Sequence, residues 1–327
     1  MNSRLLLGIV VLLLAMIGLT ACSSLSKADL ANALADLPKN EPLVDAGLTE
    51  TTMTATLEGT EREVPLTYFR GGPEGAPVIV LVHGTPATLY TWSKVIFGTE
   101  NERGLIEDFD VIAPEVIGHG IATAETPNKV TFQTCADFVS AVLDHLDVDD
   151  ATLVGNSYGG EFAWRAALDR PERVTKLVLM SSAGYPRNDD EWLPEEEAMR
   201  EMRLAKIGWI LNAKKRVEPA LQLHYHRPVT DELDECFLVC DNKQNWHAMV
   251  DLARDENGER SPELKTLSAK TLLLWGSDDK AYGIERFAKQ FERDIPDARL
   301  QLVEGSGHYP QEEFPEDVIR ALRGFVR

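Results

Sequence analysis

The sequence predicts an α/β fold built on a mostly parallel β-sheet with helices on both faces. Apolar runs alternate along the chain with segments of helical periodicity, which is typical of this class. The run at 77–82 is continuously apolar, as expected of a strand buried on both faces. The runs at 151–154, 174–180 and 270–275 are further predicted strands. Because helical segments separate these strands, neighbouring strands are expected to run parallel.

The predicted elements follow a regular order. The alternating segments 51–57 and 63–69 indicate a hairpin around a turn at 58–61. Beyond it, 110–113 is a short strand, and the apolar spacing of 131–146 predicts a helix. The remaining expected elements are the helices 160–168, 284–291 and 315–325 and the strand 300–303.

The alternation is interrupted once, between about residues 183 and 270. This stretch has no convincing buried strand, but it contains helical runs such as 195–211. It also carries Trp192, Trp209 and Trp246. We therefore expect a helical cap, residues 184–268, inserted into a core of residues 51–183 and 269–327.

The N-terminus has the pattern of an export signal. A short basic region ends at Arg4, and an uncharged apolar run follows at 5–19. This run is short for a membrane span and suits the apolar region of a signal peptide. The next residues, Leu19-Thr20-Ala21-Cys22, resemble the bacterial lipobox. The sequence thus predicts a lipoprotein signal peptide at 1–21, with a plain secretory signal or a short anchor as the alternatives.

The lipobox resemblance implies that Cys22 becomes the mature N-terminus and carries a diacylglycerol thioether. Ser23 after this cysteine is similar to the outer-membrane sorting pattern, and attachment in a Gram-positive envelope is the alternative. Residues 22–50 are polar and charged, with loose helical spacing, so we expect a tether between the anchor and the folded body.

Charge and cysteine content narrow the expected partners. The chain carries 33 Lys and Arg against 53 Asp and Glu, a net charge of −20, so its surface repels nucleic acid. An odd number of cysteines follows Cys22, so at least one thiol is free. Cys135 is expected in a helix core, whereas Cys236 and Cys240 could be bridged or free. No zinc-ligand spacing is visible.

The strongest chemical signal is Val154-Gly155-Asn156-Ser157-Tyr158-Gly159-Gly160. It matches the G-x-S-x-G motif and lies between a predicted strand and a predicted helix, the context that motif requires. Its glycines leave room for a tight turn that projects Ser157 from the sheet edge. The helix N-terminus behind offers free N–H groups to an oxyanion. Ser157 is the candidate nucleophile, and a Ser-Gly turn without chemistry is the alternative.

A serine nucleophile requires a base, and the base requires an orienting acid. The predicted strand 270–275 leads into Gly276-Ser277-Asp278-Asp279, and the strand 300–303 leads into a glycine-rich loop with His308. His308 is therefore the candidate base. Asp279 and Asp278 both remain candidates for the acid.

Together these segments resemble the α/β-hydrolase superfamily from about Val64 to the C-terminus. The loop around His308 and the strand end Trp275-Gly276 are similar to the branch of haloalkane dehalogenases, epoxide hydrolases and serine esterases. The resemblance implies the α/β-hydrolase fold with a helical cap. It also implies Asp279, the fourth residue of Gly-x-x-Asp, as the acid, with Asp278 as the alternative.

The segment Val82-His83-Gly84-Thr85-Pro86 resembles the H-G-x-P loop of this superfamily. Because Pro86 has no N–H, the resemblance implies that Thr85 supplies one oxyanion-hole N–H and Tyr158 the other. His83 is expected to be structural. Trp92 matches an aromatic residue after this loop, in the substrate pocket or the core, and Trp209 of the cap is a second pocket candidate.

Two departures from the family pattern matter. Dehalogenases and epoxide hydrolases of this branch use an aspartate nucleophile, so Ser157 argues for acyl transfer instead. The family turn Asp-x-x-Gly-x-Gly-x-Ser is present as Glu115 to Ala122, and the sequence leads us to expect His119 at the surface.

The sequence thus predicts a lipid-anchored serine hydrolase of the bacterial cell envelope. Its expected substrate is a small carboxylic ester, lactone or acyl amide, without a metal or organic cofactor. Carbon-carbon bond hydrolysis or perhydrolysis on the same triad is one alternative, and a non-catalytic envelope binding protein is another. The oligomeric state stays open.

Overall fold

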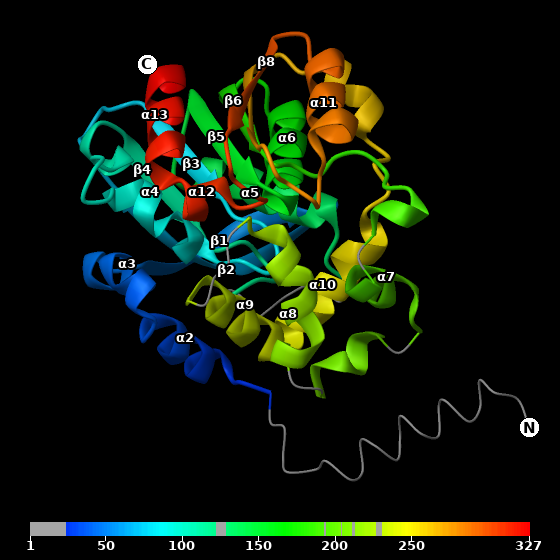
Figure 1. The fold of residues 1–327 in the computed structure, drawn as a ribbon. Helices are drawn as coiled ribbons and strands as arrows, with labels where there is room; N and C mark the ends of the chain where they lie inside the picture. The colour runs from blue at the N-terminus through cyan, green and yellow to red at the C-terminus, as the bar shows by residue number, and fades with distance from the viewer. Residues whose placement is uncertain (1–23, 122–128, 193, 204, 211–212, 227–230) are drawn as a thin grey trace, which may run out of the picture.

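A mixed eight-stranded sheet forms the centre of the molecule (Figure 1). The computed structural model describes residues 24–121, 129–192, 194–203, 205–210, 213–226 and 231–327. The strand order is β1-β2-β4-β3-β5-β6-β7-β8; β2 pairs antiparallel with β1 and β4, and the other pairs are parallel. The predicted fold class is confirmed. The strands are β1 (Thr49–Leu57), β2 (Thr60–Gly71), β3 (Val78–Val82), β4 (Asp110–Pro114), β5 (Ala151–Asn156), β6 (Val174–Met180), β7 (Lys270–Gly276) and β8 (Ala298–Val303).

Helices cover the sheet on both faces, and alternate strand residues feed the two apolar layers. Leu153 and Leu273 pack into one layer, whereas Val154 and Leu274 pack into the other. The first layer lies under α5 (Phe132–His145), α6 (Tyr158–Asp169) and α11 (Lys289–Asp294), and the second under α4 (Ser93–Phe97) and α13 (Pro315–Val326). With both faces covered, polar groups of the loops can meet only at the strand ends.

The cap lies between β6 and β7, on the side of the sheet where the strands β3, β5 and β7 end (Figure 1). Its α-helices are α7 (Pro194–Glu201), α8 (Ala213–His224), α9 (Asp231–Asp241) and α10 (Lys243–Asp255). The expected helix 195–211 is interrupted: α7 ends at Glu201, and a 3-10 helix follows at Ala205–Ile210. The cap has its own apolar cluster, which includes Leu221, Phe237 and Trp246.

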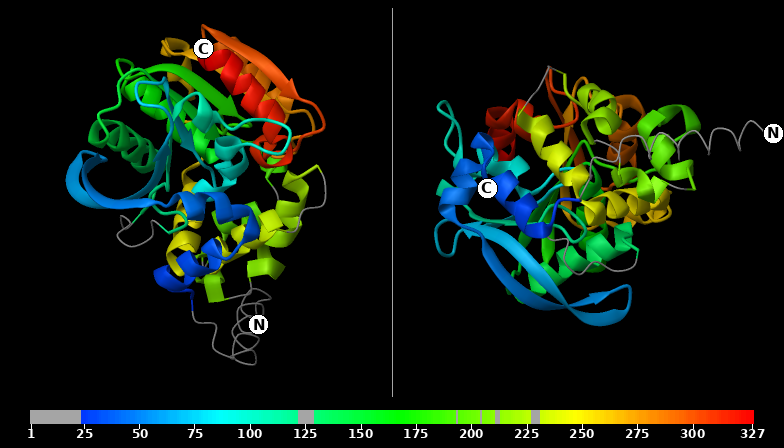
Figure 2. Two further views of the ribbon diagram at one scale, coloured as in Figure 1. Left: turned by 90° about the vertical axis from the view of Figure 1, so that its left-hand side faces the viewer. Right: turned by 90° about the horizontal axis from the view of Figure 1, so that it is seen from below.

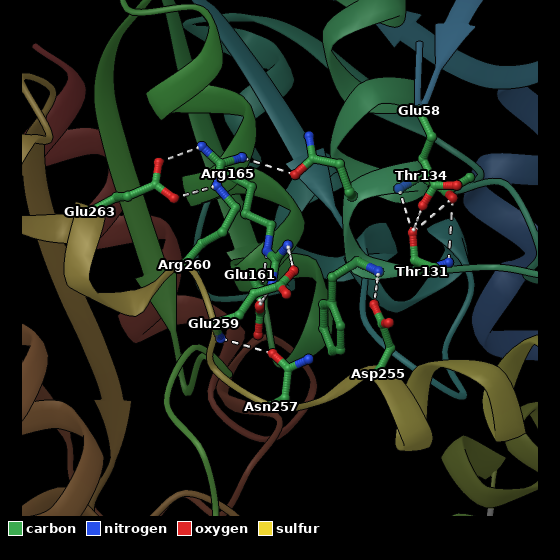
Figure 3. A network of polar contacts seen from close by, with 12 residues as sticks. Glu58, Thr131, Thr134, Glu161, Arg165, Asp255, Asn257, Glu259, Arg260 and Glu263 are labelled. Carbon is green, nitrogen blue, oxygen red and sulfur yellow. Dashed lines mark hydrogen bonds and ion pairs between the residues drawn. The ribbon is translucent and has the colours of Figure 1, made fainter. Parts of the chain in front are cut away.

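The segment after α10 is fastened to the core by charged side chains (Figure 3). Arg260 bonds both Asp169 at the end of α6 and Glu263, at 2.8 Å each. Below this contact, Arg165 and Glu161 form a buried ion pair at 2.7 Å within α6. The bond between Arg260 and Asp169 ties the second cap junction to the helix that begins beside Ser157.

The sequence led us to expect a tether at residues 22–50. This expectation is wrong for residues 24–50, the part of it that the structure describes. Two helices, α2 (Lys27–Ala35) and α3 (Glu41–Ala46), pack onto the folded body, with α2 beside α9 of the cap (Figures 1 and 2). Leu30, Leu34 and Leu43 are fully buried in the second apolar layer. Burying these leucines removes apolar surface from water, which favours packing over a free spacer.

The described ranges also show the state of three cysteines and were searched for membrane-spanning helices. Cys135, Cys236 and Cys240 are buried and form no disulfide, so the last two are not bridged. No helix in these ranges has both the length and the apolar character needed to cross a bilayer. Cys22 and the predicted signal peptide lie outside the described residues.

Candidate active site

Ser157 occupies the sharp turn between β5 and α6. Its backbone has φ 57° and ψ −126°, a conformation that a residue with a side chain rarely adopts. The neighbouring glycines make the turn possible. A Cβ on Gly155 would collide with the carbonyl of Gly159, and one on Gly159 would collide with the backbone of His83. The motif therefore forms a strained turn with Ser157 at its apex, as its spacing predicts.

His308 and Asp279 come from the loops after β8 and β7. The two side chains meet at 3.0 Å between Nδ1 of His308 and Oδ2 of Asp279. The other oxygen of Asp279 accepts the backbone N–H groups of Ala281 at 2.8 Å and Tyr282 at 3.0 Å. Asp278 instead bonds His226 at the surface, at 2.9 Å. Of the two candidate acids, only Asp279 is placed to orient His308.

The environment of Asp279 favours its ionised form. Burial raises the pKa of this carboxyl. The nearby His308 and the hydrogen bonds to the carboxylate lower it by more, so the pKa lies below the ordinary value. An ionised Asp279 holds the proton of His308 on Nδ1 and leaves Nε2 free to act as a base.

Ser157 and His308 line one cavity between core and cap, with a volume of about 60 Å³. Thr85 and Tyr158 lie on its wall, so the predicted oxyanion residues are brought to the same place. The cap supplies mainly apolar side chains to this cavity: Met199, Val217, Leu221, Met249 and Ala253. The arrangement is suited to a small substrate with an apolar portion.

One of the two tryptophans expected at the substrate pocket lies elsewhere. Trp92 does not line the cavity; it is fully buried in the second apolar layer. The 3-10 helix Leu89–Trp92 packs on the side of the sheet covered by α4 and α13, so the indole becomes core. Trp209, the second pocket candidate, lies outside the residues whose side chains the structure describes.

The expected surface position of His119 is also wrong. Its side chain is 1% exposed, and its Nε2 bonds the hydroxyl of Thr85. His83, expected to be structural, is fully buried and accepts the N–H of Val116 at 3.0 Å. The two imidazole rings pack edge to face, with their centroids 5.5 Å apart, and His119 contacts the loop that carries Thr85.

The structure also shows a buried hydrogen-bond network around Glu256, which no sequence motif predicts. Glu256, just after α10, accepts the hydroxyls of Tyr158 at 2.7 Å and Tyr282 at 2.9 Å. It also pairs with Arg187 at 2.8 Å, and Arg187 pairs with Glu196 on the cavity wall at 2.8 Å. A single buried carboxylate thus links the cap to residues next to Ser157 and Asp279.

The comparisons with known proteins agree with this architecture. A family model described as alpha/beta hydrolase fold matches residues 77–211. The chain has the α/β-hydrolase fold, and residues 77–211 are similar to that family. An uncharacterized hydrolase of Bacillus subtilis, YugF, is 28% identical over 77% of this chain and 91% of its own length.

Similar proteins with a named activity differ in their reactions. The 2-hydroxymuconate semialdehyde hydrolase of Pseudomonas putida is 27% identical over 66% of this chain and 76% of its own. The solved structure of a thermophilic esterase from Thermogutta terrifontis has a TM-score of 0.69 and is 25% identical, over 85% of this chain and 98% of that one. These proteins share the fold of this chain but carry out different reactions, so the fold alone does not identify its reaction.

Proposed function

We propose that this protein is a serine hydrolase that cleaves a carboxylic ester through an acyl-enzyme, with lactones and small acyl amides as related substrates. The observation that carries the proposal is the strained turn of Ser157 at the cavity that His308 also lines. His308 is in turn hydrogen-bonded to Asp279. Nucleophile, base and orienting acid are thus held on three separate strand ends of a rigid sheet.

In the proposed reaction the hydroxyl oxygen of Ser157 attacks the ester carbonyl carbon while Nε2 of His308 takes its proton. The oxyanion accepts hydrogen bonds from the backbone N–H groups of Thr85 and Tyr158; the latter begins α6 and has no partner within its helix. The tetrahedral intermediate then expels the alcohol, which receives the proton from His308. Water releases the acid by the same route and regenerates Ser157.

A second candidate reaction uses the same residues. Hydrolysis of a carbon-carbon bond in a diketone is favoured by the likeness to 2-hydroxymuconate semialdehyde hydrolase. Product analysis after incubation with a simple ester and with a vinylogous diketone separates the two reactions. Release of acid from the ester alone supports the first proposal, and cleavage of the diketone alone supports the second.

The test of the proposed function is labelling of the purified full-length protein with a fluorophosphonate probe. We expect the wild type to be labelled at Ser157 and the Ser157→Ala and His308→Ala variants to remain unlabelled. Asp279→Asn is expected to lower kcat on a p-nitrophenyl ester by about 10⁴-fold, since the imidazole loses its orienting charge.

Asp278→Asn is the matched control, because Asp278 contacts surface His226 instead of His308. Its kcat is expected to stay within about twofold of the wild type, in line with the small worth of exposed ion pairs. A folded wild type that no fluorophosphonate labels contradicts the serine-hydrolase proposal and favours a binding role.

We also propose attachment to the bacterial cell envelope through a lipid on Cys22, after removal of residues 1–21. Support comes from the sequence pattern around Cys22. The acyl chains of a diacylglycerol bury enough CH₂ groups to hold a protein of this size at a bilayer. An outer-membrane position, facing the periplasm or the outside, follows from Ser23 in an organism that has such a membrane.

A further inference from the structure

His224 brings a second imidazole to the cavity of Ser157 and His308. It is the last residue of cap helix α8, its side chain lines the cavity, and it is 8% exposed. The centroids of the His224 and His308 rings are 5.2 Å apart. The cap thus places a polar ring directly beside the proposed catalytic base.

Neither ring nitrogen of His224 has a hydrogen-bond partner among the described residues. Burying a polar group without a partner costs stability, so such groups are rare in folded proteins. The cavity is the side on which a partner can still arrive. An imidazole in this state is ready to bind a polar group of the substrate.

The backbone around His224 is held firmly against the loop that carries His308. The carbonyl of His224 accepts the N–H of His308 at 2.6 Å. Tyr225 donates its hydroxyl to Glu312 at 2.7 Å and stacks on Tyr309. These contacts fix the position of the second imidazole relative to the first without using its ring nitrogens.

The charge state and surroundings of His224 define what it can recognise. Burial, and then the neighbouring His308, lower the pKa of His224 to about 4, so the ring is neutral at pH 7. A neutral imidazole offers one N–H donor and one acceptor nitrogen. The nearby cap residues Val217 and Leu221 are apolar. Such a site matches a neutral oxygen group, such as a hydroxyl.

We propose that His224 binds the alcohol portion of the substrate, and that this portion carries a second oxygen close to the ester oxygen, as in monoesters of glycols and glycerol. The inference rests on the proposed ester hydrolysis. In that reaction His308 delivers its proton to the leaving alcohol, so the group beside His308 lies on the alcohol side.

The test compares two esters that differ by one group, 2-hydroxyethyl butyrate and propyl butyrate. The first has a hydroxyl where the second has a methyl, and butyric acid released by the full-length protein is titrated for both. One hydrogen bond corresponds to about a tenfold preference in kcat/KM for the hydroxyethyl ester. His224→Phe and the smaller His224→Leu are expected to bring this ratio close to one.

His224→Gln restores a donor and an acceptor and is expected to recover part of the preference. His145→Phe, at an exposed histidine of α5, is the matched control and should keep the wild-type ratio. Thermal unfolding identifies which variants are folded.

Labelling with the fluorophosphonate separates this inference from the proposed function. A labelled wild type without preference, or one that hydrolyses neither ester, overturns the role of His224 alone. A preference that persists in His224→Phe or His224→Leu does the same. A folded wild type that is not labelled overturns the proposed function, and the inference with it.

Discussion

At the scale of single residues, His119 was expected at the surface but is buried in the structure. His119 is almost fully enclosed, and burial, followed by the neighbouring His83, lowers its pKa to about 3. In the unfolded chain a histidine has a pKa near 6.5. The unfolded chain therefore binds a proton before the folded protein does as the pH falls.

This difference predicts an acid-sensitive fold. A depressed folded pKa stabilises the protein above the unfolded pKa, and the stability is lost as the pH falls from about 6.5 towards about 3. The loss approaches about 1.4 kcal/mol per pH unit for each such histidine. Urea unfolding of the wild type between pH 7 and pH 5 should show this fall in the free energy of unfolding. The His119→Gln variant should have a smaller slope of unfolding free energy against pH, by up to about 1.4 kcal/mol per pH unit.

The exposed Thr56 provides the control, because Thr56→Ser changes no titratable group and should leave the pH dependence unchanged. The absolute stability of His119→Gln is not the readout, since losing the bond to Thr85 also costs stability. Parallel slopes for His119→Gln and the wild type would show that His119 keeps an ordinary pKa.

At the scale of elements, the N-terminal helices α2 and α3, with Lys39 between them, contact both core and cap; we call this segment, residues 27–46, the strap. Lys39, between α2 and α3, pairs with Glu235 of α9 at 2.6 Å and lies 3.6 Å from Glu312 of α12 (Pro310–Glu313). Burial lowers the pKa of Lys39, but the two carboxylates raise it more strongly, so the net shift is upward and the ammonium stays charged. Glu235 also accepts the backbone N–H of Thr88, close to the oxyanion loop.

Because Lys39 pairs with buried carboxylates, we expect its replacement to lower the free energy of unfolding strongly. Lys39→Met leaves Glu235 as a buried carboxylate without its partner, which typically costs about 3–5 kcal/mol. Urea unfolding at pH 7 measures this loss. Lys289→Met breaks the exposed pair with Glu285 and should cost under about 1 kcal/mol. Equal costs in the two variants would mean that the strap contributes no more than a surface contact.

At the scale of the whole molecule, the start of the described chain lies against the cap. The hydroxyl of Ser24 accepts the N–H of Lys243, at the start of α10, at 2.9 Å. The carbonyl of Leu25 accepts the side-chain amide of Asn242 at 3.0 Å. Figure 2 shows the N-terminal helix α2 beside the cap. Since Cys22 precedes Ser24 by only two residues, a lipid on Cys22 would place the cap side of the molecule towards the bilayer.

The proposed anchor is testable with the full chain expressed in a bacterium. We expect wild-type protein to partition into the detergent phase of Triton X-114, and its N-terminal peptide to carry a diacylglycerol thioether by mass spectrometry. Cys22→Ser should move the protein to the aqueous phase, whereas Ser23→Ala should stay with the detergent. An unmodified Cys22 thiol in the wild type would contradict lipid attachment.

Local pattern was enough to predict the fold class and the order of its chemical groups. Strand runs, the strained turn around Ser157 and the loops with Asp279 and His308 are encoded in contiguous residues, so they can be read without coordinates. The choice of Asp279 over Asp278 as the partner of His308 needed the structure, because two adjacent carboxylates differ only in where their loop points them.

The sequence by itself determined the fold class, the serine turn and the export pattern, because each depends on neighbours along the chain. Only the tertiary structure decided the burial of Trp92 and His119, the strap around Lys39 and the place of His224 beside His308. In each of these, residues far apart in sequence exclude water together. Burial, and with it the cost or value of a polar group, is a property of that packing and not of the local pattern.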